Sequence, residues 1–224
     1  MFFRGRIKYN RYLCSDYYQN TILKHKKKVI MGQKKTFIAI LAAMLLAVPT
    51  MGQSKKGKSL EVSFNYQKQG GAGSNQYAVW IENAKGECVK TLFVTSFTTK
   101  GRARGNQPAQ RGYVMRPTCV PEWVKASNAA AKSDQQLDAV TGATPQNSGV
   151  QTFTWNFKDE QGKAVPNGTY KVKVEATLYF ESDIIYTGTF STQGKAGAIK
   201  LTSALTKPDE QHKGMISDVK AVLK

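Results

Sequence analysis

Thr144 is the residue whose type and surroundings most clearly suggest chemistry. Residues 138–144 read Asp-Ala-Val-Thr-Gly-Ala-Thr, so this threonine closes a run of small side chains. Its hydroxyl is a nucleophile that a partner enzyme could activate. Gly142 and Ala143 lack bulky side chains and would let another protein's backbone come close. The run is therefore a candidate for chemistry at the Thr144 hydroxyl.

Two further residues belong to this candidate site, and a second interpretation competes with it. Asp138 could orient the loop, or it could help to manage a proton or a metal ion during a reaction at Thr144. Thr141 lies in the same run and belongs to the candidate site. The same residues also fit an ordinary helix exit, in which Gly142 follows the last turn and Pro145 stops the helix. Both interpretations stay open on the residues alone.

The histidine and cysteine content argues against an enzyme or a metal protein. The chain has two histidines, His25 and His212, so a metal site with several histidines is excluded and a Ser-His-Asp triad is a poor fit. Cys88 and Cys119 could form one disulfide in an oxidising compartment, or they could be two separate buried thiols. We expect no catalytic residues and no metal site.

Four arginines and a tryptophan lie in the segment that precedes the candidate site. Arg102, Arg104, Arg111 and Arg116 could gather around a phosphate, which the forked guanidinium binds well, or they could form a solvated basic loop. Trp123 could stack on a planar ring or belong to the core. These residues are secondary candidates for ligand binding.

The N-terminal part of the chain has the features of a secretory signal. Residues 31–52 combine a basic start, an apolar stretch at 36–50 and small residues at the exit. The apolar stretch is shorter than the ~20 residues that a membrane-spanning helix needs. We expect cleavage after Gly52, which leaves residues 53–224 as a periplasmic protein without a membrane span. Residues 1–30 would be a misassigned start or an unusual extension.

Cleavage after Gly52 would change the net charge of the protein. Residues 1–52 carry ten Lys or Arg and one Asp, so their removal lowers the formal net charge from +18 to +9. Proteins that bind nucleic acids concentrate basic residues on one face or along one helix. A net charge of +9 does not require such a partner, and we expect no nucleic acid.

Alternation of apolar and polar residues predicts strands through most of the mature chain. Trp80 and Trp155 lie on two of them and are expected in the core. The predicted strands are residues 60–66, 77–82, 88–97, 151–157, 169–180 and 184–191, with further candidates at 198–201 and 215–223. The last of these could also be a short helix.

An insertion at about residues 99–146 interrupts the strand pattern. It begins as a basic loop with glycines, and Pro121 then suits the first turn of a helix that we expect to cover residues 123–137. Short strands separated by regular turns predict an all-β fold, an antiparallel immunoglobulin-like β-sandwich with a loop and short-helix insertion. Residues 53–224 would form a single domain.

Two stretches carry a resemblance to known proteins. Residues 80–92 (Trp-Ile-Glu-Asn-Ala-Lys-Gly-Glu-Cys-Val-Lys-Thr-Leu) and residues 155–170, with Trp155, Asp-Glu-Gln-Gly and Pro-Asn-Gly-Thr-Tyr, resemble the immunoglobulin-like domain of flagellar hook-capping proteins. Together with the insertion, they are similar to an uncharacterised family of predicted periplasmic proteins, a domain of unknown function. The resemblance implies the fold rather than flagellar work.

Residues 138–144 carry a second resemblance. They are similar to the motif at which flavin mononucleotide (FMN) is attached to threonine through a phosphoester, by a transferase that uses a flavin dinucleotide donor. This resemblance implies that Thr144 is the acceptor. It also implies a flavin transferase and a membrane redox protein as partners.

Two functions are compatible with these features. The first is an exported periplasmic protein without catalytic activity, which acts as a binding or accessory module for an unknown protein partner. The alternative is an electron-transfer protein that carries FMN covalently at Thr144. The state of Thr144 distinguishes them.

Overall fold

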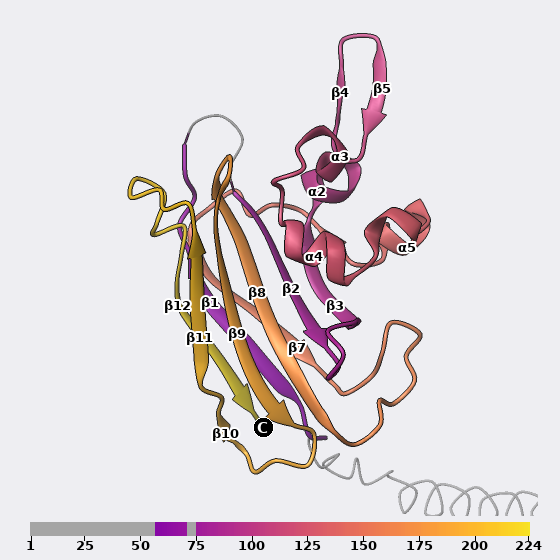
Figure 1. Ribbon diagram of the computed structural model, residues 1–224, viewed down its shortest axis with the longest axis vertical. Helices are drawn as coiled ribbons and strands as arrows, with labels where there is room; N and C mark the ends of the chain where they lie inside the picture. Colours follow the sequence, from indigo (N-terminus) through magenta and orange to yellow (C-terminus); the bar gives the residue numbers. More distant parts are fainter. Residues whose placement is uncertain (1–56, 71–74) are drawn as a thin grey trace, which may run out of the picture. The chain divides into compact units, whose positions relative to one another are not determined.

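The computed structural model describes residues 57–70 and 75–224. The predicted signal segment, its cleavage site and the N-terminal extension lie outside the described residues. The described part is mostly β-structure, with a group of short helices between β3 and β7 (Figure 1).

Two sheets contain most of the strands. The first has four strands, which are, in spatial order, β10 (Gly197–Ala198), β12 (Ile216–Leu223), β1 (Leu60–Tyr66) and β7 (Gly149–Trp155). The second has six, which are β11 (Leu201–Thr206), β9 (Ser182–Ser191), β8 (Thr169–Tyr179), β2 (Gln76–Glu82), β3 (Cys88–Thr95) and β6 (Thr141–Gly142).

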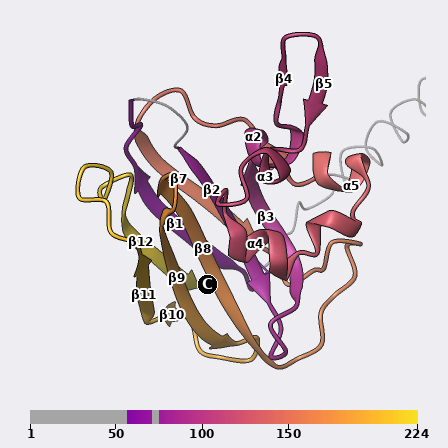
Figure 2. The same ribbon diagram turned by 45° about the horizontal axis from the view of Figure 1, so that its top comes forward.

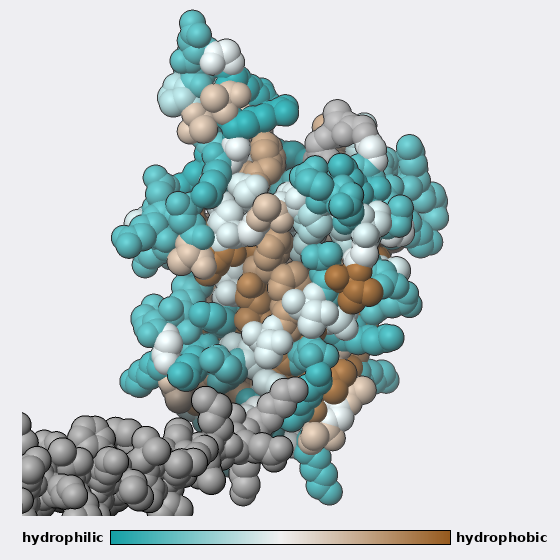
Figure 3. Space-filling view, turned by 180° about the vertical axis from the view of Figure 1, so that it is seen from behind, coloured by the Kyte–Doolittle hydropathy of each residue, from teal (hydrophilic) through white to brown (hydrophobic). Residues whose placement is uncertain are grey.

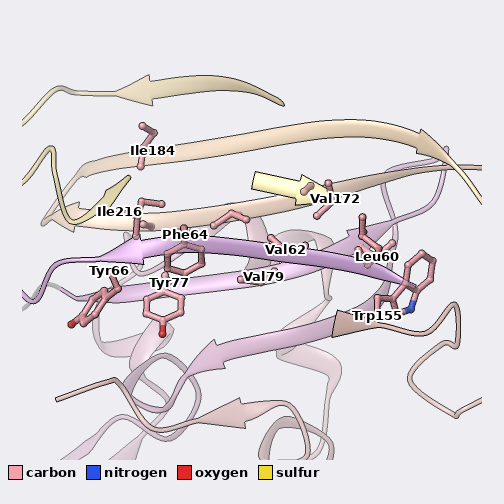
Figure 4. Packing of buried hydrophobic residues seen from close by; sticks show 14 of the residues in the cluster. Leu60, Val62, Phe64, Tyr66, Tyr77, Val79, Trp155, Val172, Ile184 and Ile216 are labelled. Atoms are coloured by element: carbon pink, nitrogen blue, oxygen red, sulfur yellow. The ribbon is translucent and has the colours of Figure 1, made fainter. Parts of the chain in front are cut away.

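The two sheets face each other across a common apolar core, which Figure 4 shows from close by. Alternate residues of β1 point into it, because side chains on a strand alternate between its two faces. Trp155 lies opposite Leu60 at one end of the core and packs against Tyr170 and Phe190. The strands predicted at residues 60–66, 151–157 and 169–180 correspond to β1, β7 and β8, and alternate apolar residues of each pack into this core.

Some apolar residues that pack against this core reach the surface. Phe93 and Phe153, whose ring centroids are 5.2 Å apart, are only partly buried. On the face in Figure 3, apolar side chains gather in a band along the middle, with polar side chains around them. The core between the two sheets buries one side of the six-stranded sheet.

The insertion covers part of the other side of the six-stranded sheet, mainly over β2, β3 and β8. It comprises α2 (Ser96–Lys100), a hairpin of β4 (Arg102–Arg104) and β5 (Gln107–Gln110), α3 (Gly112–Met115), α4 (Pro121–Ala126), η1 (Ala129–Ala131) and α5 (Asp134–Asp138). A second apolar cluster joins it to the sheet, with Trp80 and Val94 on the strands and Trp123 and Leu137 on the helices. Every residue of β2 is buried as a result.

The structure corrects the single helix expected over residues 123–137. Two helices and a 3₁₀ turn occupy this stretch instead. Asn128 has φ 50°, a left-handed conformation that ends the first segment. Ser133 then starts α5 with a capping box, since its side chain accepts from the Gln136 backbone N–H while the Gln136 side chain accepts from the Ser133 N–H.

The strand pairing tests three further features: the direction of the strands, the C-terminal segment and the second and third strands. The sheets are not purely antiparallel, because β6 pairs with β3 in parallel through Val94 and Thr141. Residues 215–223, for which strand and helix were both open, form a strand, since β12 pairs with β1. The second and third predicted strands form β2 and β3, which pair with each other antiparallel.

Candidate functional site

The predicted attachment run leaves α5 and enters the edge of the six-stranded sheet. Asp138 is the last residue of α5, and Thr141 and Gly142 form β6. The Thr141 hydroxyl donates to the Leu137 carbonyl (2.6 Å) and lies 2.8 Å from the Thr99 hydroxyl. Thr141 therefore holds the run to α2 and α5. The chain does leave a helix here, but α5 ends at Asp138 and Gly142 lies in β6 rather than directly after the last turn.

Gly142 allows a close approach between β6 and the Phe93 ring. A Cβ atom added here would lie 2.1 Å from Cε2 of that ring. Any side chain would therefore force the Phe93 ring or β6 to move. The fold thus favours a glycine at this position, whether or not a transferase also needs it.

Thr144 follows β6 in an irregular segment and is half-buried, while Ala143 is exposed. Among the described residues, the hydrogen bonds of Thr144 involve its carbonyl, which accepts from the Gln146 side chain (3.1 Å), rather than its hydroxyl. The hydroxyl is consequently not committed to holding this segment. The structure leaves it available as an acceptor.

Asp138 faces a surface depression of about 480 Å³. Its carboxylate lies 3.1 Å from the Lys100 ammonium, and both side chains are largely exposed. Arg111 and Asp134 form a second ion pair at the same depression, 2.9 Å apart. Of residues 138–144, Asp138 alone lines it, so the depression and Thr144 are not one site in the described part of the chain.

The four arginines of the insertion do not converge on one point. Arg102 and Arg104 lie on β4 beside a second depression of about 370 Å³. Arg111 is a structural clamp, because it donates to the carbonyls of Ala129 and Lys132 as well as to Asp134. Arg116 lines neither depression. Of the two alternatives left open for these arginines, a common phosphate site is not supported by this arrangement.

The hairpin β4–β5 extends away from the two sheets, as Figures 1 and 2 both show. All seven residues of its strands are exposed, including Arg102 and Arg104. Its base is tightly packed, since a Cβ atom on Gly101, which has φ 61°, would lie 1.6 Å from the Gln110 carbonyl oxygen. A fixed base thus presents an exposed basic hairpin.

Cys88 and Cys119 are free thiols, and the disulfide alternative is wrong for this structure. Cys88 begins β3 and contacts Thr91, whereas Cys119 contacts Thr98 in α2, beyond the other end of that strand. An eight-residue strand separates its ends by roughly 20 Å, far more than a disulfide can span. Burial raises the pKa of each thiol to about 11, so both are poor nucleophiles at neutral pH.

Trp123 is a core residue rather than an exposed stacking surface. It is fully buried, and its indole N–H donates to the Thr91 hydroxyl (3.2 Å). Thr91 also lies 3.4 Å from Glu160, which pairs with Lys132 of the insertion. This polar chain fastens the helices to β3 beside the second apolar cluster.

Glu175 is a buried group that the strand pattern placed on the outward face of β8. The insertion covers this face, and the carboxylate accepts the backbone N–H groups of Glu122 (3.0 Å) and Trp123 (2.9 Å) at the start of α4. Burial raises the pKa of Glu175 to about 8, and its two hydrogen bonds oppose the shift. Alternation in one strand cannot reveal that a distant segment covers the outward face.

Residues 59–204 match the model of the family described as "Predicted periplasmic protein (DUF2271)". The chain belongs to this family. The expected periplasmic location is confirmed, as is the resemblance to a family of unknown function. Comparisons with curated proteins and with solved structures find no match.

Two searches of the described residues complete the description of candidate sites. Within residues 57–70 and 75–224, histidine, cysteine, aspartate and glutamate side chains form no group of three that could hold a metal ion. No helix in this part of the protein is both long and apolar enough to cross a membrane.

Proposed function

We propose that this DUF2271 protein is a periplasmic accessory protein without catalytic activity, and that it binds an acidic protein partner through the β4–β5 hairpin. The observation that carries the proposal is the exposed hairpin on a tightly packed base. Arg102 and Arg104 give it positive charge, and the depression beside it adds Val114 and Met115. Charged rims with apolar contacts beside them are typical of protein interfaces.

The layer behind the hairpin supports this proposal. Trp123 and Leu137 bury the helices against the sheet, so a partner would meet a preformed surface. A preformed surface lowers the entropic cost of binding. Val114 contributes an exposed apolar side chain, 57% accessible, next to the arginines.

Site-specific photocrosslinking in the native periplasm tests the proposal. A photoreactive residue at Ala103 should give one discrete adduct, and the same residue at Ala204, exposed on β11, should not. Charge reversal by Arg102→Glu with Arg104→Glu should remove the adduct, because the acidic partner would be repelled. Equal labelling at both positions, or an adduct unaffected by the reversal, would contradict it.

A specific observation favours a second function, in which the protein carries FMN at Thr144. The run 138–144 is intact, and the Thr144 hydroxyl is half-buried beside the exposed Ala143, without a structural hydrogen bond among the described residues. These residues fit an acceptor that receives FMN from a flavin dinucleotide through a phosphoester. Bound flavin would supply redox chemistry, and the chain's part would be to present the Thr144 oxygen.

Intact mass of the protein from its own periplasm tests this second function. The mass should exceed the calculated value by one FMN less water in the native chain and in Thr152→Ala, an exposed control on β7, but not in Thr144→Ala. In-gel flavin fluorescence should follow the same order. An unmodified native mass, in cells whose flavin transferase is active, would leave the accessory function alone.

For the fold, we infer an immunoglobulin-like sandwich. Trp155 between the facing sheets and the Pro166–Gly168 turn that leads into β8 support it. The fold would be a scaffold for either function.

A further inference from the structure

Arg116 has an unusual environment for a charged side chain. It follows α3, and its Nε, Nη1 and Nη2 atoms are all buried. Within the described residues, none of the three atoms has a hydrogen-bond partner, and no carboxylate pairs with this guanidinium. Five N–H donors are therefore unsatisfied.

Its neighbours hold the side chain in place without satisfying it. The ring of Phe180 lies 5.9 Å from the guanidinium carbon, a cation–π distance. An aromatic ring offers the guanidinium no oxygen acceptor, so the contact leaves the N–H donors without hydrogen bonds. The acid of the same hairpin tip, Glu181, pairs with Lys207 instead.

The backbone that carries Arg116 is fixed to the sheet. Thr177 of β8 donates to the Thr118 carbonyl (3.1 Å) and accepts from the Val120 N–H (2.9 Å). The Arg116 carbonyl accepts from the Cys119 N–H (2.9 Å), which closes the turn. The guanidinium is thus presented by a rigid segment rather than by a loop that could carry it into water.

Arg111, five residues earlier in the same insertion, shows how this fold satisfies an arginine that serves structure. Its guanidinium has oxygen partners on Tyr113, Ala129, Lys132 and Asp134. A buried charge without such partners is costly, and proteins rarely keep one that has no counter-ion. Burial correspondingly lowers the pKa of Arg116.

We propose that Arg116 anchors a binding site for an oxyanion, a carboxylate or phosphate group of a ligand, between the 116–119 turn and the tip of the β8–β9 hairpin. The fork of N–H donors accepts two oxygens of such a group. The ligand would supply the counter-ion that residues 57–70 and 75–224 do not.

Phe180 is the group that would admit the ligand. It sits at the hairpin tip with φ 43° and is 49% exposed, so its side chain is covered on one side only. A rotation of this side chain would uncover the guanidinium edge without disturbing the sheets. Phe180→Ala should therefore strengthen binding of a small oxyanion at least twofold, or leave it unchanged, while Arg116 is retained.

Thermal melting of the purified protein with inorganic phosphate or with acetate, each against sodium chloride at equal ionic strength, tests the site. One or both oxyanions should raise the melting temperature of the native protein saturably, by a few degrees. Arg116→Met should abolish the rise, Arg116→Lys should weaken it, and Arg102→Met, the matched loss of an exposed arginine, should preserve it.

The comparison without oxyanion separates this site from a structural arginine. Arg116→Met should then melt at or above the native temperature, because it removes an unpaired buried charge. A response to phosphate alone would identify a phosphate-bearing ligand, and one to acetate alone a carboxylate. The proposal is wrong if neither oxyanion exceeds chloride, if Arg116→Met responds like the native protein, or if that variant is destabilised without oxyanion.

Discussion

At the scale of single residues, Glu175 links the packing of the insertion to pH. Its carboxyl is fully buried under α4, and burial raises its pKa to about 8 from the ordinary 4.5. Between these values, the folded protein holds a proton that the unfolded chain has released. The free energy of unfolding therefore falls as the pH rises through this window. Asp183, whose pKa burial also raises, adds to the trend.

Glu175→Gln should flatten this pH dependence, because the amide does not titrate. We expect the native protein to lose about 1–4 kcal/mol of stability relative to the variant between pH 5 and pH 9. Urea unfolding at a series of pH values measures the difference. Glu210→Gln, which replaces an exposed carboxyl, should follow the native curve. Parallel native and Glu175→Gln curves would show that this carboxyl does not titrate with folding.

At the scale of elements, the break between α4 and α5 depends on local caps. The Ser133 hydroxyl accepts the Gln136 N–H and thereby satisfies a backbone donor at the start of α5. Ser133→Ala should cost about 1 kcal/mol, whereas Ser203→Ala on the exposed side of β11 should cost less than about 0.5 kcal/mol. Chemical denaturation measures both. Equal effects would mean that the cap does not stabilise the insertion.

Alternation of apolar and polar residues predicts a strand most directly where one face of the strand is buried and the other is exposed. Residues 60–66 were predicted with their observed bounds, because alternation there reflects one buried face. The alternation that marks residues 151–157 likewise survives in β7. The helix expected over 123–137 was wrong because alanine content says nothing about a left-handed Asn128.

The candidate site was less predictable than the strands. Residues 138–144 were singled out by type, and their order along the sheet edge follows from the chain itself. The environments of Glu175 and Arg116 depend on which distant segment covers them, and no local pattern contains that information. Gly142 illustrates the difference, since its need for close approach comes from Phe93, about fifty residues earlier.

At the scale of the whole described part, the two apolar clusters share one sheet. Trp155 belongs to the sandwich cluster and Trp123 to the cluster beneath the insertion. Trp123→Ala should cost about 3–5 kcal/mol, because a large buried side chain is lost. The damage should be greatest in the insertion, since the sandwich core does not include this residue.

Thiol reactivity reports where that damage falls. In a Cys88→Ser background, Cys119 is buried and should react slowly with a thiol reagent in the native fold. Trp123→Ala should speed the reaction at least tenfold while the far-ultraviolet β-sheet signal persists. Leu205→Ala, a truncation on the opposite side of the sheet, should leave the rate nearly unchanged. Loss of the sheet signal together with fast reaction would mean that the clusters unfold as one.

The pairing of β1 with β12 also constrains the time order of folding. Leu60 lies opposite Leu223, so the strand in the middle of the four-stranded sheet has one neighbour from the far end of the domain. Closing so long a loop is entropically slow, and topologies with distant contacts fold slowly. Until residues 216–223 are available, one edge of β1 keeps its backbone hydrogen-bonding groups unpaired. An incompletely folded chain would therefore expose an aggregation-prone strand edge until β12 pairs with β1. This is the interval in which a periplasmic chaperone would matter most.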